Sequence, residues 1–391
     1  MSNNRSSLIT SIEVLESRLP MKDLGKDREG ISVVYKPGTE GSATVFCYRV
    51  HTESGISGEY VGGDSVGFAQ FRKLAPSFIG LDALERELIY DRSRRELRKY
   101  DKMGMGPFDI ALWDFAGKYF DAPISKLLGG WRKRLPCYAS TMSGDRNGGL
   151  DSPEAFAEFA IQCKNLGYPA FKLHIWDDYT ITELVKTIHL VRDAVGPEMG
   201  LMLDPACKLQ TFLEALQVAR ACDEAGFLWM EDPYKDGGVS IPGHARLSQL
   251  TRTPLLQSEH VHGPEEKANF VIGGGTHLIR VDAEYDGGIT GALKIAHFAE
   301  AMGLDVEIHS PSPAHRHLMS AIRNTNYYEM ALVHPLTPLI GRPQDIYSCD
   351  YKDGLEVVDS DGCVTVPQGP GLGVIYDWDL LTHYKSMEYR A

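Results

Sequence analysis

The residues of this chain that could carry out chemistry are ionisable side chains placed late in short apolar runs. The run AFKLHI contributes two of them, two residues apart, and six later runs contribute one each. Those six follow one another at spacings of 20 to 28 residues, which is about the length of one strand and one helix. In order along the chain, the eight residues are Lys172, His174, Asp204, Glu231, Glu259, Asp282, His309 and Glu329.

The three consecutive carboxylates of this set are Asp204, Glu231 and Glu259. Three carboxylates in a dry site repel one another and raise each other's pKa unless a cation lies between them. An all-oxygen ligand set suits Mg²⁺, with Mn²⁺ as an alternative, because Zn²⁺ prefers His and Cys. We therefore predict that these three residues bind Mg²⁺.

Taken singly, each of these residues has an ordinary structural explanation. A lone Asp or Glu at a strand end is commonly a helix cap or an ion pair, and a lone His is commonly a structural residue. Asp232 could replace Glu231 as the inward residue, but the period of two in a strand lets only one of them face the site. The whole set, in register on consecutive runs, is what indicates a functional site.

The elements that would position this set alternate between strand and helix from Pro136 onward. Eight short apolar runs, from CYAST to YYEMAL, are separated by amphipathic segments such as ITELVKTIHLVRDAV. This alternation predicts an α/β fold with a closed TIM-type (β/α)8 barrel over residues 131–345, whose catalytic groups lie at the C-terminal ends of the strands. An open doubly wound sheet is the alternative, but no GxGxxG turn follows the first strand.

The remainder of the chain predicts a smaller α+β unit. Residues 8–62 contain β-branched and aromatic runs typical of antiparallel strands, joined by two mobile loops, MKDLGKDREG and ESGISGEYVGG. Residues 65–128 have helical periodicity. We assign residues 1–130 to this N-terminal unit and expect the tail, residues 346–391, to return to it.

The composition excludes several classes of partner. A net charge of -13 and the absence of a basic run argue against nucleic acid and anionic membranes. Seven scattered cysteines without a CxxC pair suit reduced thiols. The N-terminus lacks the apolar segment of about 7–15 residues that a signal peptide needs, and no run approaches the roughly 20 residues of a membrane span. We expect a cytoplasmic protein that acts on small molecules.

With its eight ionisable residues at the ends of successive apolar runs, the chain resembles the mandelate racemase-like subgroup of the enolase superfamily. That subgroup contains acid-sugar dehydratases and racemases. The resemblance extends over most of the chain and includes IALWDFAGKYFDAPISKLLGG before the barrel and VPQGPGLGV near the end. It implies an N-terminal capping domain whose loops, near residues 20–30 and 52–63, close over the substrate. Frequent symmetric assemblies in this family imply a homo-oligomer.

The resemblance also implies a role for each residue of the set. Asp204, Glu231 and Glu259 would be the Mg²⁺ ligands, and Asp282 and His309 would form an acid/base dyad. Glu329 would contact the substrate carboxylate, while Lys172 and His174 would lie on the other face of the reacting carbon.

Two positions depart from the family pattern. The second strand usually carries Lys-x-Lys, whereas this chain has Lys172-Leu173-His174. A neighbouring ammonium disfavours a protonated imidazole, so His174 could act as a base at pH 7, and either His174 or Lys172 could be the residue that touches the carbon. Ala206 stands where the family often has Asn, which implies a different pocket around the leaving group.

These features predict a hydro-lyase: a Mg²⁺-dependent dehydratase that abstracts the α-proton of a sugar acid, forms an enediolate and eliminates the β-hydroxyl to give a 2-keto-3-deoxy acid. A racemase or epimerase using 1,1-proton transfer would need the same residues. A non-catalytic binding protein on this fold is a poorer explanation, because it would be free to lose metal ligands and none of the ligand positions is missing. A Schiff-base aldolase built on Lys172 is poorer still, because it gives no role to three carboxylates.

Overall fold

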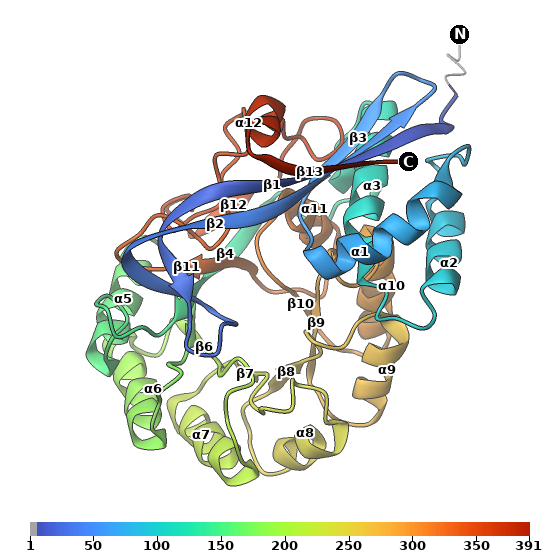
Figure 1. Cartoon of the computed structure of the whole chain (residues 1–391). Coiled ribbons are helices and arrows are strands. Elements are labelled where there is room, and N and C mark those ends of the chain that lie inside the picture. The colour runs from blue at the N-terminus through green and yellow to red at the C-terminus, as the bar shows by residue number, and fades with distance from the viewer. Residues whose placement is uncertain (1–5) are drawn as a thin grey trace.

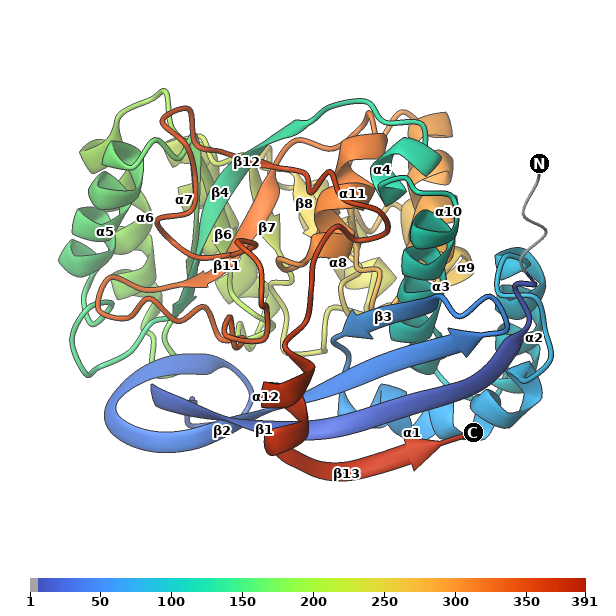
Figure 2. The ribbon, with the colours of Figure 1, turned by 90° about the horizontal axis from the view of Figure 1, so that it is seen from above.

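The computed structural model describes residues 6–391, so residues 1–5 of the predicted N-terminal unit lie outside the described residues. Two sheets organise the chain, one with four strands and one with nine (Figure 1). Figure 2 shows the four-stranded sheet lying across one end of the barrel. None of the helices formed by residues 6–391 is long and apolar enough to cross a membrane.

The larger sheet contains the predicted barrel. Eight strands pair in parallel in chain order, and the last strand, β11, pairs with the first, β4, which closes the sheet into a cylinder. The eight strands are β4 (Arg134–Ser143), β5 (Ala170–His174), β6 (Gly200–Asp204), β7 (Trp229–Glu231), β8 (Leu255–Gln257), β9 (Leu278–Val281), β10 (Val306–Ile308) and β11 (Tyr328–Val333). Each contains residues of one of the eight apolar runs, so the fold class that the sequence predicts is confirmed.

Seven helices connect these strands and cover the outside of the cylinder (Figure 1). Three of them show ordinary side-chain caps: Ser152 and Thr180 accept hydrogen bonds from the first turns of two helices, and Thr211 forms a capping box with Glu214. The helices are α5 (Pro153–Asn165), α6 (Ile181–Val195), α7 (Phe212–Ala225), α8 (Ile241–Ser248), α9 (Pro264–Ile272), α10 (Gly288–Ala301) and α11 (Pro313–Ala321).

The smaller sheet belongs to the N-terminal unit and has the order β13-β1-β2-β3. Its strands are β1 (Ile9–Lys26), β2 (Val33–Thr52), β3 (Ser57–Val61) and β13 (Lys385–Arg390). β13 pairs antiparallel with β1, so the end of the tail joins this sheet. Helices α1 (Ser65–Leu74), α2 (Arg86–Glu96) and α3 (Gly106–Tyr119) follow this sheet in the chain, and α4 (Ile124–Leu127) packs against α3 and α11. The tail adds α12 (Trp378–His383) and β12 (Cys363–Thr365), which pairs with β4.

Part of each stretch that was expected to be a mobile loop is strand. β1 continues through MKDLGK to Lys26, and its register shifts between Lys22 and Leu24, where Asp23 has a φ of 58°. The bulge puts Met21 and Leu24 on one face, where they pack against the barrel. The glycine-rich stretch likewise contains β3. Local polarity and glycine content suggested loops there, but β1 packs one face against the barrel and β3 packs against α3.

Candidate active site

The eight residues of the predicted set gather at the C-terminal ends of the barrel strands. β5 contains Lys172 and ends at His174, while β6 ends at Asp204 and β7 ends at Glu231. The other four members follow β8, β9 and β10 or lie within β11. A cavity of about 740 Å³ opens there and is lined by six of the eight. The six are Lys172, His174, Asp204, Glu259, His309 and Glu329. Asp282 is connected to the cavity through His309, and Glu231 does not line it.

Lys172 lies among three carboxylates inside the barrel. Its Nζ is 2.7 Å from Glu231, 2.9 Å from Glu329 and 3.3 Å from Asp204, and the side chain is 1% exposed. Burial by itself lowers the pKa of this ammonium, but Glu231 and Glu329 outweigh burial and hold its pKa well above the usual value. Lys172 is therefore held as a cation.

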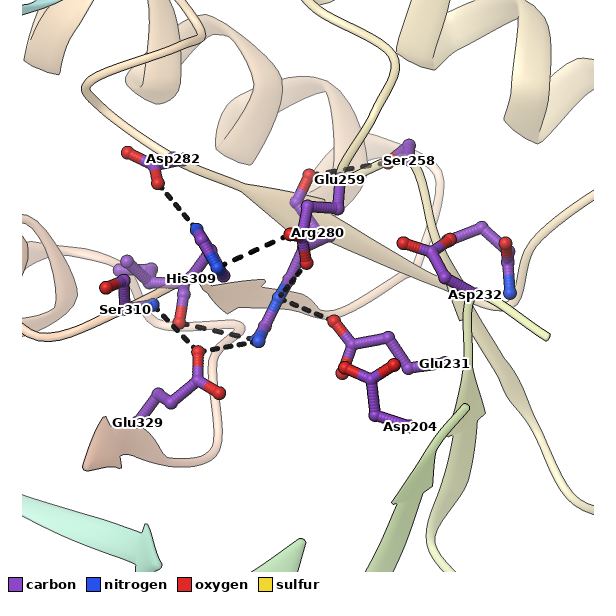
Figure 3. Close-up of polar contacts among 12 residues, drawn as sticks. Asp204, Glu231, Asp232, Ser258, Glu259, Arg280, Asp282, His309, Ser310 and Glu329 are labelled. Atoms are coloured by element: carbon purple, nitrogen blue, oxygen red, sulfur yellow. Dashed lines mark hydrogen bonds and ion pairs between the residues drawn. The ribbon is translucent and has the colours of Figure 1, made fainter. Parts of the chain in front are cut away.

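Arg280, which sequence reasoning did not single out, is the second buried cation. Its Nε lies 2.8 Å from Glu231 and its Nη2 lies 2.6 Å from Glu329, so it bridges them as Figure 3 shows. Its Nη1 also donates to the hydroxyl of Tyr138 over 3.1 Å. The signal available in the sequence was an arginine inside the apolar run LIRVD, two residues before Asp282 and thus on the same face of the strand.

Among the three predicted metal ligands, Glu231 remains short of positive charge despite these two cations. Burial and the carboxylates of Asp204 and Glu259 raise the pKa of Glu231, although Arg280 and Lys172 lower it. Its Oε1 accepts no hydrogen bond of good geometry from the described residues. A divalent cation would relieve this excess of negative charge, so the donor set of Asp204, Glu231 and Glu259 fits Mg²⁺.

Asp232, the alternative to Glu231, is also buried, at 2% exposure, and lines the cavity. Its φ of 30° breaks the strict alternation of a strand, which is why Asp232 can line the cavity although Glu231 also points into the barrel, toward Lys172 and Arg280. Burial and the nearby Glu259 and Glu231 raise the pKa of Asp232 well above its usual value. The period-two argument that only one of the two could face the site was therefore too strict.

His174 is oriented by the first carboxylate of the set. Its Nε2 lies 3.0 Å from Asp204 Oδ2, while its Nδ1 is buried and has no hydrogen-bond partner among the described residues. When Nε2 carries the proton that Asp204 accepts, the lone pair of the neutral ring is on Nδ1. His174 can therefore accept a proton at an atom that no other described residue engages.

His309 is oriented by Asp282. Its Nδ1 lies 2.7 Å from Asp282 Oδ2, and its Nε2 lies 3.4 Å from Glu259 Oε1. Burial alone lowers the pKa of His309, but Glu259 and Asp282 outweigh burial and raise that pKa to about 9. The protonated imidazole can thus donate a proton from Nε2.

Asp282 is itself fixed from the other side. Its Oδ1 accepts a hydrogen bond from the Glu284 backbone N–H over 2.7 Å and lies 3.2 Å from His315 Nε2. His315 and His309 hold the pKa of the buried Asp282 well below its usual value. His315 was missed because it lies in a helix, six residues beyond His309, where no strand pattern marks it.

Glu329 is occupied by the two buried cations. Besides Lys172 and Arg280, it accepts a hydrogen bond from the Ser310 backbone N–H over 2.7 Å. Although burial raises its pKa, Arg280 and Lys172 hold that pKa well below the usual value. Glu329 is therefore an ionised hydrogen-bond acceptor in the wall of the cavity.

The hairpin of the N-terminal unit contributes to the same cavity. Lys26, Ile31, Ser32 and Val33 line it around the turn between β1 and β2. The second expected loop behaves differently, since residues 61–63 line a separate cavity of about 120 Å³ next to Glu284. Closure of either segment over a substrate stays a prediction.

Comparisons with known proteins agree with this architecture. The family model described as "Enolase C-terminal domain-like" matches residues 155–380, and the model "Mandelate racemase / muconate lactonizing enzyme, N-terminal domain" matches residues 30–129. The chain is 27% identical to L-talarate/galactarate dehydratase of Salmonella typhimurium, over 78% of this chain and 76% of that protein.

Two further similarities extend this picture. The chain is 28% identical to D-galactarolactone cycloisomerase of Agrobacterium fabrum, over 78% of this chain and 82% of that protein. Among solved structures, D-glucarate dehydratase from Agrobacterium tumefaciens complexed with magnesium has a TM-score of 0.86 and 28% identity, covering 97% of this chain and 100% of that one.

Proposed function

Because the chain belongs to the mandelate racemase and muconate lactonizing enzyme family of the enolase superfamily, we propose that it is a Mg²⁺-dependent dehydratase of a sugar acid. The observation that carries the proposal is the pair of oriented imidazoles. His174 and His309 each contact a carboxylate through one ring nitrogen and line the same cavity, and Asp204 and Glu259 line that cavity too. The similarity to sugar-acid dehydratases supports the same reaction.

In this proposal, His174 removes the α-proton of the acid at Nδ1. Asp204, Glu231 and Glu259 would hold Mg²⁺, whose positive charge would stabilise the substrate carboxylate as a second negative charge develops. The choice of His174 over Lys172 follows from charge, because Lys172 is held as a cation by three carboxylates and has no lone pair to offer. Lys172 instead orients the carboxylate end of the substrate.

His309 completes the elimination from a different side of the barrel, since it follows the seventh strand and His174 ends the second. It delivers the Nε2 proton to the β-hydroxyl, the C–O bond breaks, and water leaves. The resulting enol takes up a proton at the β-carbon and becomes a 2-keto-3-deoxy acid. Asp282 holds the tautomer of His309 throughout.

A screen of aldonic and aldaric acids tests the proposal. Purified protein with Mg²⁺ should convert at least one acid to a keto acid that semicarbazide traps, and His309→Asn should abolish the conversion. Glu231→Gln should lose both turnover and the stabilisation that Mg²⁺ gives in a thermal melt. If no acid in a stereochemically complete library yields a keto acid, dehydration is the wrong reaction.

The alternative reaction is 1,1-proton transfer, because two imidazoles that face one cavity can serve opposite faces of a carbon. The similarity to a cycloisomerase favours keeping this alternative. Solvent deuterium that enters the α-position with inversion and without loss of water would identify a racemase or epimerase.

A further inference from the structure

A second group of potential metal ligands lies beside the proposed Mg²⁺ site. Cys207, Asp232 and His260 follow β6, β7 and β8, and their ligand atoms all lie within 4.8 Å of one another. All three side chains line the cavity that His174 and His309 share. None of them belongs to the set of Asp204, Glu231 and Glu259.

Asp232 is the member of this group that most needs a cation. It is 98% buried, since its exposure is 2%, and both carboxylate oxygens lack a hydrogen bond of good geometry from the described residues. The ion pair that it does form is with His260, whose Nε2 lies 3.3 Å from Oδ2. A buried carboxylate without hydrogen bonds is costly, and natural proteins rarely keep one without a ligand or ion. In Figure 3, Asp232 stands apart from the ion pairs of Arg280.

The backbone fixes the positions of two of the three ligands. The Cys207 N–H donates to the Asp232 carbonyl over 2.7 Å, and the next pairing, Leu209 N–H to the Pro233 carbonyl, measures 3.0 Å. Gly238 packs over the carboxylate so closely that a Cβ there would lie 2.7 Å from Asp232 Oδ1. Cys207 and Asp232 are therefore held next to each other before any ion binds.

The chemistry of the donors selects the ion. A thiolate, an imidazole and a carboxylate form the mixed sulfur, nitrogen and oxygen set that Zn²⁺ prefers, whereas Mg²⁺ avoids sulfur. Bonds of about 2.0–2.3 Å to a tetrahedral Zn²⁺ bring ligand atoms to roughly 3.3–3.8 Å from one another, so small side-chain rotations complete the set. His260 is 44% exposed and has room to make that movement.

We propose that Cys207, Asp232 and His260 bind one Zn²⁺ ion at a site separate from the Mg²⁺ site. Three protein ligands leave the fourth coordination position of the ion open. Because all three ligands line the shared cavity, the open position faces that cavity. Binding releases the thiol proton of Cys207 to solvent. An oxygen of a ligand in the cavity can then occupy the open position, which adds a second point of attachment for a polyhydroxy acid.

Co²⁺ is the probe for this site, because a thiolate bound to Co²⁺ gives a charge-transfer absorption band that Mg²⁺ and oxygen-only sites do not give. The full-length protein is first saturated with Mg²⁺ and then titrated with Co²⁺. We expect a band that saturates at one Co²⁺ per chain and disappears when one equivalent of Zn²⁺ is added. The absorption band does not depend on turnover. Its presence or absence therefore tests the Zn²⁺ site without testing the proposed dehydration.

Three variants make the test specific. Cys207→Ser should abolish the band, and His260→Gln should weaken Co²⁺ and Zn²⁺ binding at least tenfold. Cys349→Ser, at a half-buried cysteine of the tail, is the matched control and should keep the band unchanged. Thermal melts confirm that each variant is folded. The proposal is wrong if the wild type gives no band, or if Cys207→Ser keeps the band and the Zn²⁺ stoichiometry of the wild type.

Discussion

His309 Nδ1 and Asp282 Oδ2 lie 2.7 Å apart, and this contact fixes which nitrogen of the imidazole faces the cavity. With Nδ1–H donating to Asp282, Nε2 is the atom that exchanges a proton with a ligand. His315 and the Glu284 backbone hold Asp282 from behind. The dyad is therefore oriented by the fold before a substrate binds.

His309→Asn should abolish dehydration while leaving proton abstraction by His174 intact. The amide can still donate to Asp282, but it cannot deliver a proton, and loss of a general acid typically costs 10²–10⁴-fold in rate. Keto acid formation measures the first effect, and exchange of the α-proton in deuterium oxide measures the second. Loss of both in a folded variant would mean that His309 also positions the substrate.

The rate of the wild type should have an alkaline limb set by His309. Its pKa is raised to about 9, so the protonated acid is present below that pH and is lost as the pH rises through it. Mg²⁺ bound to Glu259 would weaken one cause of this rise and move the limb to lower pH. A pH profile of kcat at several Mg²⁺ concentrations checks the direction. A limb that moves upward with Mg²⁺ would contradict the assignment.

His174→Ala should stop exchange of the α-proton, because it removes the free lone pair at Nδ1. His174→Lys should retain part of the exchange, since an amine can serve as the base at this position. Nuclear magnetic resonance in deuterium oxide follows the exchange directly. Unchanged exchange in His174→Ala would transfer the role of base to Lys172.

Arg280→Met should lower the free energy of unfolding by about 3–5 kcal/mol, because it leaves Glu231 and Glu329 with one buried cation fewer. Saturating Mg²⁺ should recover part of this loss by restoring positive charge near Glu231. Denaturant unfolding with and without Mg²⁺ measures both effects. Arg323→Met is the matched control: its ion pair with Glu300 is exposed, so the expected loss is within about 1 kcal/mol.

Glu307→Gln should stabilise the fold at pH 8 and not at pH 4. Burial raises the pKa of Glu307 to about 7, although hydrogen bonds from Asn326 and Tyr327 lower it, whereas its ordinary value is 4.5. The folded state therefore binds more protons than the unfolded state between these values, and stability falls as the pH rises from about 4.5 through 7. The shift corresponds to about 3 kcal/mol at pH 8. Thermal melts of both proteins at the two pH values test the sign, and equal melting differences at pH 4 and pH 8 would refute it.

The sequence by itself determined the barrel and the identity of its ionisable residues. Alternating strand and helix periodicity is local, so each of the eight strands could be placed from its own run, and the spacing from Asp204 to Glu329 followed from the regular length of the units. The roles given to those residues rest on the family resemblance and on charge.

Only the tertiary structure decided how these residues are paired. Arg280 reaches Glu329 across 49 positions of sequence, and Lys172 reaches Glu231 across 59, because closure of β11 onto β4 brings distant strands around one axis. Asp232 joins the cavity through a φ of 30° that no periodicity predicts. Local pattern places a residue on a strand, but the charge that a residue faces depends on which strands the closed barrel makes its neighbours.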